Sequence, residues 1–370
     1  MISPNAEPVF LASGDSEGGV SVHSLHGGEE VHRLEVGAYV TDLAFGVTVD
    51  EYYHAHRQLV VATEDGNVQS WKVPSGGLLH GPFDGQRQLG LNPIAVGTTT
   101  EQEALLAKSR VEGDSSEGVV DLVDLRTGEY VRTLSMGNEL PVSLGIGGEP
   151  GKEVVAAGTR SGEVWTWNLP VALGEATTQD IRPWMGPAIS RNPSGLRGRI
   201  TALDVGSRHV FAGDGYNYLS VIPTPNAPDA VEYVVRGGVT YDGGKTILPH
   251  PVRGVAVGTY GNTEIVATMR QQEDPVDRAL LSVRTAASSE EGGRELMRLT
   301  ADTLASRTVV VAPILGQAAV IAGFSDGTVR SYSVPDPNSN EFLRAPLEHA
   351  DSFRYSDRIV RADITALAVG

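Results

Sequence analysis

The sequence contains no cysteine and only four lysines in 370 residues. Without cysteine the chain can form no disulfide, no thiolate metal site and no cysteine nucleophile. Lysine and arginine together number 29, against 46 aspartates and glutamates, which gives a formal net charge of -17. Nucleic-acid affinity comes mainly from basic residues that neutralise phosphates, so we expect no nucleic-acid partner and no binding to an anionic membrane surface.

Long apolar runs are missing as well. No segment approaches the roughly 18 to 20 apolar residues that a membrane span needs, and residues 1–8 lack the charged and apolar regions of a signal peptide. We therefore expect a cytoplasmic protein. The excess of arginine over lysine is typical of a GC-rich bacterial genome, for example an actinobacterial one. Hydrophobic residues still make up 40% of the chain, which is enough to build a core.

One short apolar segment recurs along the whole chain. Its copies are residues 40–46, 93–97, 141–147, 200–206, 252–258, 308–313 and 364–370. Successive copies end 50 to 59 residues apart. This spacing is too long for repeats of helical pairs and is typical of units that contain four strands with their loops.

Each copy is followed by an apolar strand with an alanine, a turn, and a third strand with alternating apolar residues. Residues 59–71 and 320–332 are the clearest examples, and their Asp-Gly turns predict a tight hairpin. A fourth segment with period-two alternation closes some units, as in residues 28–34, 128–134 and 293–299. We name the four strands a to d from the centre outward.

These units predict an all-β fold, a seven-bladed β-propeller of four-stranded antiparallel blades. The chain begins at strand b near Val9 and ends at strand a near Val369. The C-terminal strand is therefore expected to pair with the N-terminal blade, which closes the ring and covers the inner edge of that blade. We expect one domain over residues 1–370, with residues 8–35 and 360–370 sharing a blade, and a monomer.

The third strands of several units share a Gly-x-Val-x-x-Trp type of pattern, best seen in residues 66–71, 162–167 and 327–332. In this respect the chain resembles the WD-repeat (WD40-like) β-propeller family over nearly its whole length. It departs from the family at the Trp-Asp dipeptide and lacks the Gly-His pair that precedes strand a. The dipeptide positions read His23-Ser24, Trp71-Lys72, Val123-Asp124, Trp167-Asn168 and Tyr332-Ser333. The departures predict that apolar packing, rather than the hydrogen-bonded tetrad of the family, holds the blades together.

Polar residues near strand a could support chemistry in the central channel. They are Asp42, Asn92, Asp204, His250, Arg253 and Asp363. Asp42, His250 and Asp363 are the candidate metal ligands among them. His54 and His56 add two imidazoles at a spacing that a transition metal can use, although a solvated loop has the same composition. A propeller hydrolase or lyase with a metal or carboxylate site in the channel is therefore the alternative function.

The sequence favours a non-catalytic protein-protein interaction scaffold or recognition module without a cofactor. It has neither a nucleophile elbow nor a phosphate loop, whereas a rigid ring presents loops on both faces. The candidate partner-binding residues on the turns between strands b and c are Glu64, Arg160, Tyr216, Arg270 and Phe324. The irregular stretch 174–199 adds Arg182, Trp184 and Met185, which form either an anchor for an acidic partner segment or strand d of their own blade. The connection 335–357 has the same two interpretations.

Overall fold

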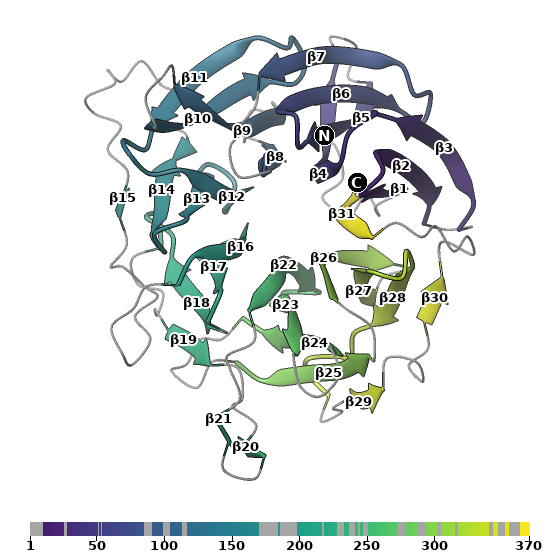
Figure 1. Ribbon diagram of the computed structural model, residues 1–370, viewed down its shortest axis with the longest axis vertical. Helices are drawn as coiled ribbons and strands as arrows, with labels where there is room; N and C mark the ends of the chain where they lie inside the picture. Colours follow the sequence, from purple (N-terminus) through teal and green to yellow (C-terminus); the bar gives the residue numbers. More distant parts are fainter. Residues whose placement is uncertain are drawn as a thin grey trace.

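The elements of the computed structural model are β-strands, which turns and loops connect within the residues it describes. These residues are 10–25, 28–50, 52, 54–84, 91–98, 104–112, 117–169, 184–185, 198–216, 218–227, 233–236, 241–242, 245–246, 251–272, 278–286, 293–301, 305–314, 317–339, 343–346, 352–354 and 363–370. The strands form seven blades around a central channel, as the repeat predicts (Figure 1).

The first four blades each contain four antiparallel strands, which follow one another from the channel outward. Blade 1 contains β31 (Ile364–Val369), β1 (Phe10–Asp15), β2 (Gly19–Ser24) and β3 (Glu30–Glu35). Blade 2 contains β4 (Val40–Val49), β5 (Ala55–Thr63), β6 (Asn67–Val73) and β7 (Leu78–Asp84). Blade 3 contains β8 (Ile94–Thr98), β9 (Ala104–Glu112), β10 (Glu117–Asp124) and β11 (Tyr130–Ser135). Blade 4 contains β12 (Pro141–Gly147), β13 (Val154–Thr159), β14 (Val164–Asn168) and β15 (Trp184–Met185).

The remaining blades include one extra strand and one extra hairpin. Blade 5 contains β16 (Ile200–Val205), β17 (His209–Asp214), β18 (Tyr218–Pro223) and β19 (Tyr233–Arg236). A separate hairpin, β20 (Tyr241–Asp242) and β21 (Lys245–Thr246), follows it. Blade 6 contains β22 (Val252–Tyr260), β23 (Thr263–Gln272), β24 (Arg278–Thr285), β25 (Glu295–Ala301) and β29 (Leu343–Pro346). Blade 7 contains β26 (Ala305–Ile314), β27 (Gln317–Phe324), β28 (Val329–Ser333) and β30 (Ser352–Arg354).

Strand β31 closes the ring by pairing with β1, which confirms the predicted closure (Figure 1). Ala12 lies opposite Ala368 in this antiparallel pair. The pairing continues beyond β31, where the amide of Phe10 donates to the carbonyl oxygen of Gly370 at 2.9 Å and the amide of Gly370 donates back at 3.1 Å. Seven consecutive strands a therefore surround the channel, and the first and last parts of the chain form one blade.

The core consists of seven apolar clusters, one between each pair of neighbouring blades. This arrangement fits the expectation that apolar packing joins the blades. The glycine that ends most copies of the repeat allows the closest approach between neighbouring strands a. A Cβ atom at Gly147 would lie 2.3 Å from the carbonyl oxygen of Val205 in the next blade, so no larger residue fits there.

Strand β29 is an addition that the repeat does not predict. The chain leaves blade 7 after β28, adds β29 to the outer edge of blade 6, and returns to blade 7 as β30. β29 runs parallel to β25, and Met297 lies opposite Leu343 in the register. Part of the connection 335–357 is thus a strand that covers the edge of a neighbouring blade. The other long stretch, 174–199, supplies β15, so the backbone of Trp184 and Met185 forms strand d of blade 4.

Candidate functional site in the central channel and on the outer rim

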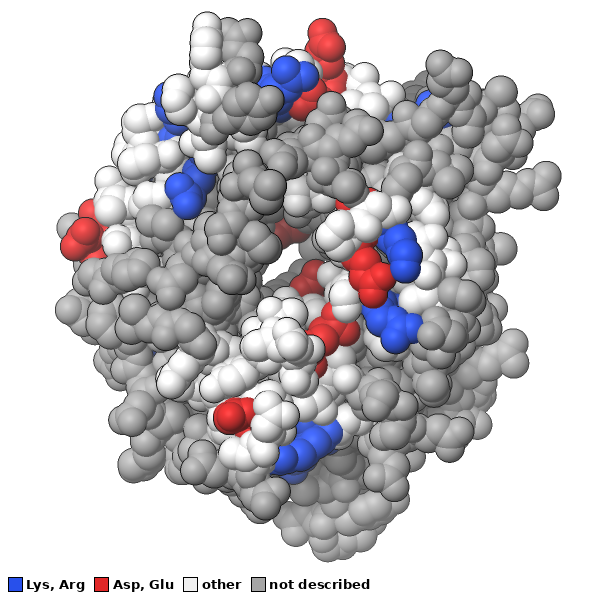
Figure 2. All heavy atoms as spheres, turned by 180° about the vertical axis from the view of Figure 1, so that it is seen from behind, with Lys and Arg blue, Asp and Glu red and all other residues white. Residues whose placement is uncertain are grey.

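The seven strands a enclose a central cavity of about 360 Å³. Most of its lining residues are apolar, for example Leu43, Ile94, Val142 and Leu203, but more than half of the surface they expose to the cavity is polar. Acidic side chains gather around the channel opening that Figure 2 shows. Asp42 and Asp204 are the two carboxylic acids among the lining residues, so the channel is the first place to look for chemistry.

Asp42 and Asp204 both use their carboxylates to join neighbouring blades. Asp42, on β4, accepts from its neighbour Leu43 at 2.9 Å and from the amide of Ile94 in blade 3 at 3.0 Å. Asp204, on β16, accepts from Val205 at 2.8 Å and from the amide of Val257 in blade 6 at 2.7 Å. In each carboxylate, one oxygen therefore accepts a hydrogen bond from the residue's own strand and the other accepts one from the next blade.

Burial raises the pKa of Asp42 to about 7 and that of Asp204 to about 6, although the backbone hydrogen bonds oppose the shift. Burial removes each carboxyl group from water and so disfavours its charged form. Perturbed pKa values are common at catalytic sites but also occur in structural networks. Because all four carboxylate oxygens accept backbone hydrogen bonds between or within blades, the geometry is that of a structural bridge.

Threonines at the second position of the repeat form a further set of bridges in the channel wall. The hydroxyl of Thr365 donates to the carbonyl oxygen of Val40 at 2.6 Å. The hydroxyl of Thr201 donates in the same way to the carbonyl oxygen of Val252. In both cases the acceptor begins strand a of the next blade. The hydroxyl and carboxyl groups of the channel are therefore used largely to hold the ring together.

Those of the other predicted channel residues that the structure describes do not form a metal site with Asp42. Asp363 is exposed, lies one residue before β31, and accepts from the amide of Ser16 through its backbone carbonyl at 3.1 Å. His250 lies outside the described residues. The side-chain amide of Asn92 donates at 3.3 Å to the carbonyl oxygen of Thr63, the last residue of β5 before the turn to β6 in blade 2. Across the described ranges, no three His, Asp or Glu side chains are placed to hold a metal ion together.

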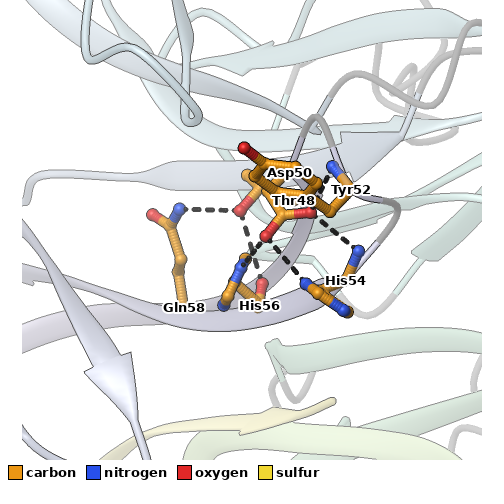
Figure 3. Close-up of polar contacts among 6 residues, drawn as sticks. All are labelled: Thr48, Asp50, Tyr52, His54, His56 and Gln58. Atoms are coloured by element: carbon orange, nitrogen blue, oxygen red, sulfur yellow. Dashed lines mark hydrogen bonds and ion pairs between the residues drawn. The ribbon is translucent and has the colours of Figure 1, made fainter.

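The two histidines singled out by their spacing both turn towards Asp50 on the hairpin between β4 and β5 (Figure 3). The Nδ1 atom of His54 lies 3.2 Å from Oδ2 of Asp50, and the Nε2 atom of His56 lies 3.0 Å from the same oxygen. The hydrogen bond from His56, with the backbone bonds of His54 and Tyr52, lowers the pKa of Asp50 against the effect of burial. This cluster closes a solvated hairpin, as one of the two sequence interpretations predicts.

The predicted partner-binding residues divide into exposed and buried ones. Glu64 and Arg160 are exposed on turns between strands b and c, and Tyr216 is half-buried on a third such turn. Arg182 lies outside the described residues. Partner binding by the exposed residues remains a prediction, as it does for Trp184 and Met185.

The placement of Arg270 and Phe324 on exposed turns is wrong. Strand β23 runs on to Gln272 and β27 runs on to Phe324, so both residues lie within strands and their side chains face the core. Arg270 is only 7% exposed and Phe324 is fully buried. The ring of Phe324 lies beneath the guanidinium of Arg330, 5.0 Å from its centroid.

The outer rim of blades 2 and 3 carries an exposed apolar patch that the sequence analysis missed. Its members are Leu78 and Leu79 on β7 and Tyr130 and Val131 on β11, which are 40% to 54% exposed. They are four of the five large apolar side chains exposed among the described residues. The ring of Phe83 on β7 meets the ring of Tyr130 edge-on at 6.2 Å, so the outer strands of these two neighbouring blades (Figure 1) touch at Tyr130. We call these four residues the rim patch.

A signal for the rim patch exists in the sequence. Leu78 and Leu79 are consecutive, as are Tyr130 and Val131, and two adjacent apolar residues break the alternation of a strand with one wet face. In β11 the break coincides with a bulge, because the register skips Val131 between Arg132 and Tyr130. Periodicity shows the break, but it does not show that the two pairs lie on the outer strands of neighbouring blades.

The fold defines the molecule as a seven-bladed β-propeller, and comparisons with solved structures agree. The chain is similar to U3-55K, with a TM-score of 0.62 and 14% sequence identity over 85% of each chain. It is also similar to a functionally unknown protein from Desulfotomaculum acetoxidans, with a TM-score of 0.55 and 9% identity over 97% of this chain and 98% of that one. At these identities the likeness shows the fold alone.

No family model and no curated protein sequence matches the chain. Within the described residues, there is also no helix with the length and apolar character needed to cross a membrane.

Proposed function

We propose that this protein is a non-catalytic interaction scaffold that binds an extended segment of a protein partner at the rim patch. The exposure of Tyr130 and Val131 on the uncovered outer edge of β11, with Leu78 and Leu79 exposed on the outer strand of the neighbouring blade, is the observation that carries this proposal. Contiguous exposed apolar surface on a soluble protein is typical of interaction sites. The patch also contains a tyrosine, a residue type that is enriched at interfaces between proteins.

Blade 6 suggests how the partner binds. Its outer strand β25 has the same bulge as β11, and the skipped residue is Leu296 where blade 3 has Val131. Blade 6 carries the added strand β29 beside β25, and there Leu296 is fully buried. Blade 3 has no added strand in the described residues, and Val131 is 42% exposed. We therefore propose that the partner adds a strand to the edge of β11 and covers Val131 and Tyr130 with its own apolar side chains.

The proposal extends to a divergent WD-repeat-like propeller in the bacterial cytoplasm. The third strands at residues 66–71 and 162–167 support the family likeness, and the lack of cysteine with the excess of arginine supports the setting. The net charge of -17 supports a protein partner rather than a nucleic acid.

The proposal is tested with peptides whose binding position can be mapped. Random nonapeptides displayed on phage are selected against the full chain, and hydrogen–deuterium exchange locates the selected peptides. We expect the amides of β11 to gain protection and Val131→Asp to weaken binding by about tenfold or more, since a charge would be buried in an apolar contact. Tyr52→Ser is the matched control, because Tyr52 is 71% exposed outside the rim patch and its loss should leave affinity unchanged. Peptides that protect other strands, or that bind Val131→Asp normally, would contradict the proposal.

A further inference from the structure

Arg270 carries a buried guanidinium that forms no ion pair within the part of the chain that the structure describes. It is 7% exposed, and among the described residues no side chain forms a hydrogen bond to its Nε atom or an ion pair with it. Burial lowers the pKa of Arg270 to about 10, and the charges of Arg284 and Arg298 add to this effect while Glu295 opposes it. A buried charge is normally paired, so an unpaired one indicates a missing counter-ion.

Blade 3 shows what the missing partner is. In blade 3, Lys108 on β9 lies opposite Asp121 on β10, and Arg110 lies two residues further along β9. The Asp121 carboxylate is fully buried and accepts from Lys108 at 3.1 Å and from Arg110 at 2.8 Å. The arginine at this position of blade 3 therefore forms an ion pair with a carboxylate on strand c of the same blade.

Blade 6 has the arginine but not the carboxylate. Thr268 on β23 lies opposite Ser282 on β24, and Arg270 lies two residues further along β23, as Arg110 does in blade 3. Ser282 thus occupies the position of Asp121. The hydroxyls of Thr268 and Ser282 bond to each other at 2.8 Å, and neither can neutralise a guanidinium.

The site lies in the gap between blades 5 and 6. Val266, on the same face of β23 as Arg270, belongs to the apolar cluster that includes Phe211 and Val221 of blade 5. Arg298 lies opposite Ser282 on β25 and is 42% exposed, so this side of the gap reaches solvent. Glu295 is engaged by Arg298 at 2.7 Å.

We infer that Arg270 marks a carboxylate-binding site between blades 5 and 6, in which an external carboxylate takes the place that Asp121 fills in blade 3. The carboxylate comes either from a small organic acid or from an acidic side chain of a protein segment. Carboxylates suit this position because a guanidinium offers them paired donors, as Arg110 does to Asp121 at 2.8 and 3.3 Å. The inference is independent of the rim patch and needs no partner at β11.

The site is tested on the full chain by measuring the unfolding temperature at fixed pH and ionic strength. Chloride is replaced stepwise by acetate in one series, and a short polyglutamate peptide is added in the other. Because a ligand that binds only the folded state stabilises it, we expect the unfolding temperature to rise with the logarithm of the probe concentration above Kd and to gain about 2 °C at tenfold Kd. A response to polyglutamate at much lower carboxylate concentration than acetate assigns the acidic segment as the source, and equal responses assign a small acid.

Two variants make the test specific. Ser282→Asp supplies the internal carboxylate of blade 3, and Arg270→Leu removes the unpaired charge. Each should raise the unfolding temperature in chloride and abolish the response to both probes. Arg33→Leu is the matched control, because Arg33 on β3 already pairs with Glu35 at 3.2 Å, and its response should equal that of the unmodified chain. Absence of any response to the probes, or a response that persists in both variants, would overturn the site.

Discussion

Blades 3 and 6 place the same strands around two different sets of charges. Across strands b, c and d, blade 3 has Lys108, Asp121 and Thr133 in register, and all of these groups bond to one another through the carboxylate. In blade 6 the corresponding row is Thr268, Ser282 and Arg298. Both rows face the preceding blade. The shared backbone therefore does not determine which residues form this row. Each blade must neutralise its own charges or take a counter-charge from outside the blade.

The outer edges of the same two blades differ as well. β25 is covered by β29, whereas β11 has no strand beside its outer edge among the described residues. The core and the edge are coupled in blade 3, because the ammonium of Lys108 lies 5.1 Å from the centroid of the Tyr130 ring. A partner at the rim patch would thus bind next to a buried ion cluster. Blades of one repeat therefore differ at two positions, in whether the outer edge is covered and in which charged residues form the row.

Asp121→Asn removes the carboxylate of the blade 3 row and should have the largest effect on the free energy of unfolding. It leaves the fully buried Lys108 and its neighbour Arg110 without a counter-charge, and removing one partner of such a cluster destabilises a protein by about 3–5 kcal/mol. Ser282→Ala is the matched change in blade 6 and should cost only about 1 kcal/mol, because it removes one neutral hydrogen bond. Chemical denaturation measures both. Equal losses for the two variants would contradict the difference between the rows.

The second prediction concerns a variant without β29, in which the outer edge of β25 is left uncovered as the edge of β11 is. Replacing Leu343–Pro346 with Gly-Ser-Gly-Ser should destabilise the protein by on the order of 2 kcal/mol, about the contribution of one buried apolar side chain, because the edge of β25 loses its neighbouring strand. Hydrogen–deuterium exchange should show faster exchange for β25 and no change for β11. Asn338→Gly, in the same connection but outside β29, is the control. If the exchange of β25 did not change, strand addition would not explain the burial of Leu296.

The sequence predicts the ring well because its signal is local and repeated. Six of the seven copies of strand a end in a glycine, and the spacing of these segments determines the number of blades without any long-range contact. The shared first blade also follows, since the unpaired strand at residues 364–370 complements a first unit that lacks strand a. What the periodicity could not predict is β29, because four residues in a long connection have no repeat to compare with.

The candidate sites were harder to predict because they depend on contacts between strands. Arg270 carries the same sequence signal as an exposed turn residue, and only the extension of β23 buries it. Asp42 and Asp204 sit at different positions of the repeat, yet both reach the amide of a neighbouring blade. No spacing in the sequence indicates this equivalence, because it arises from how the seven strands a are staggered around the channel.

The smallest expected effect concerns the carboxyl groups of the channel, whose pKa values shift in the opposite direction to that of Asp121. Hydrogen bonds from Arg110 and Thr133 and the charge of Lys108 outweigh burial and lower the pKa of Asp121, so its contribution is lost only in acid, below its usual pKa. Asp42 behaves in the opposite way. Its folded-state pKa of about 7 lies above the unfolded value, so the folded state holds the proton more tightly and stability falls as pH rises towards 7.

Between pH 5 and pH 8 the Asp121 contribution is constant, and Asp42 and, up to pH 6, Asp204 lower the stability as pH rises, whereas His23, whose pKa burial lowers, acts in the opposite direction in every variant. We expect the free energy of unfolding to fall by on the order of 1 kcal/mol per carboxyl group across this range, reduced from the full linkage value because Asp42 keeps some contact with the open channel. Asp42→Asn should remove most of this slope, since its amide oxygen still accepts from Ile94 but no longer titrates. Asp65→Asn, on an exposed turn, should keep the full slope. A slope that survives in the double variant of Asp42 and Asp204 would show that the channel bridges are not the groups that titrate.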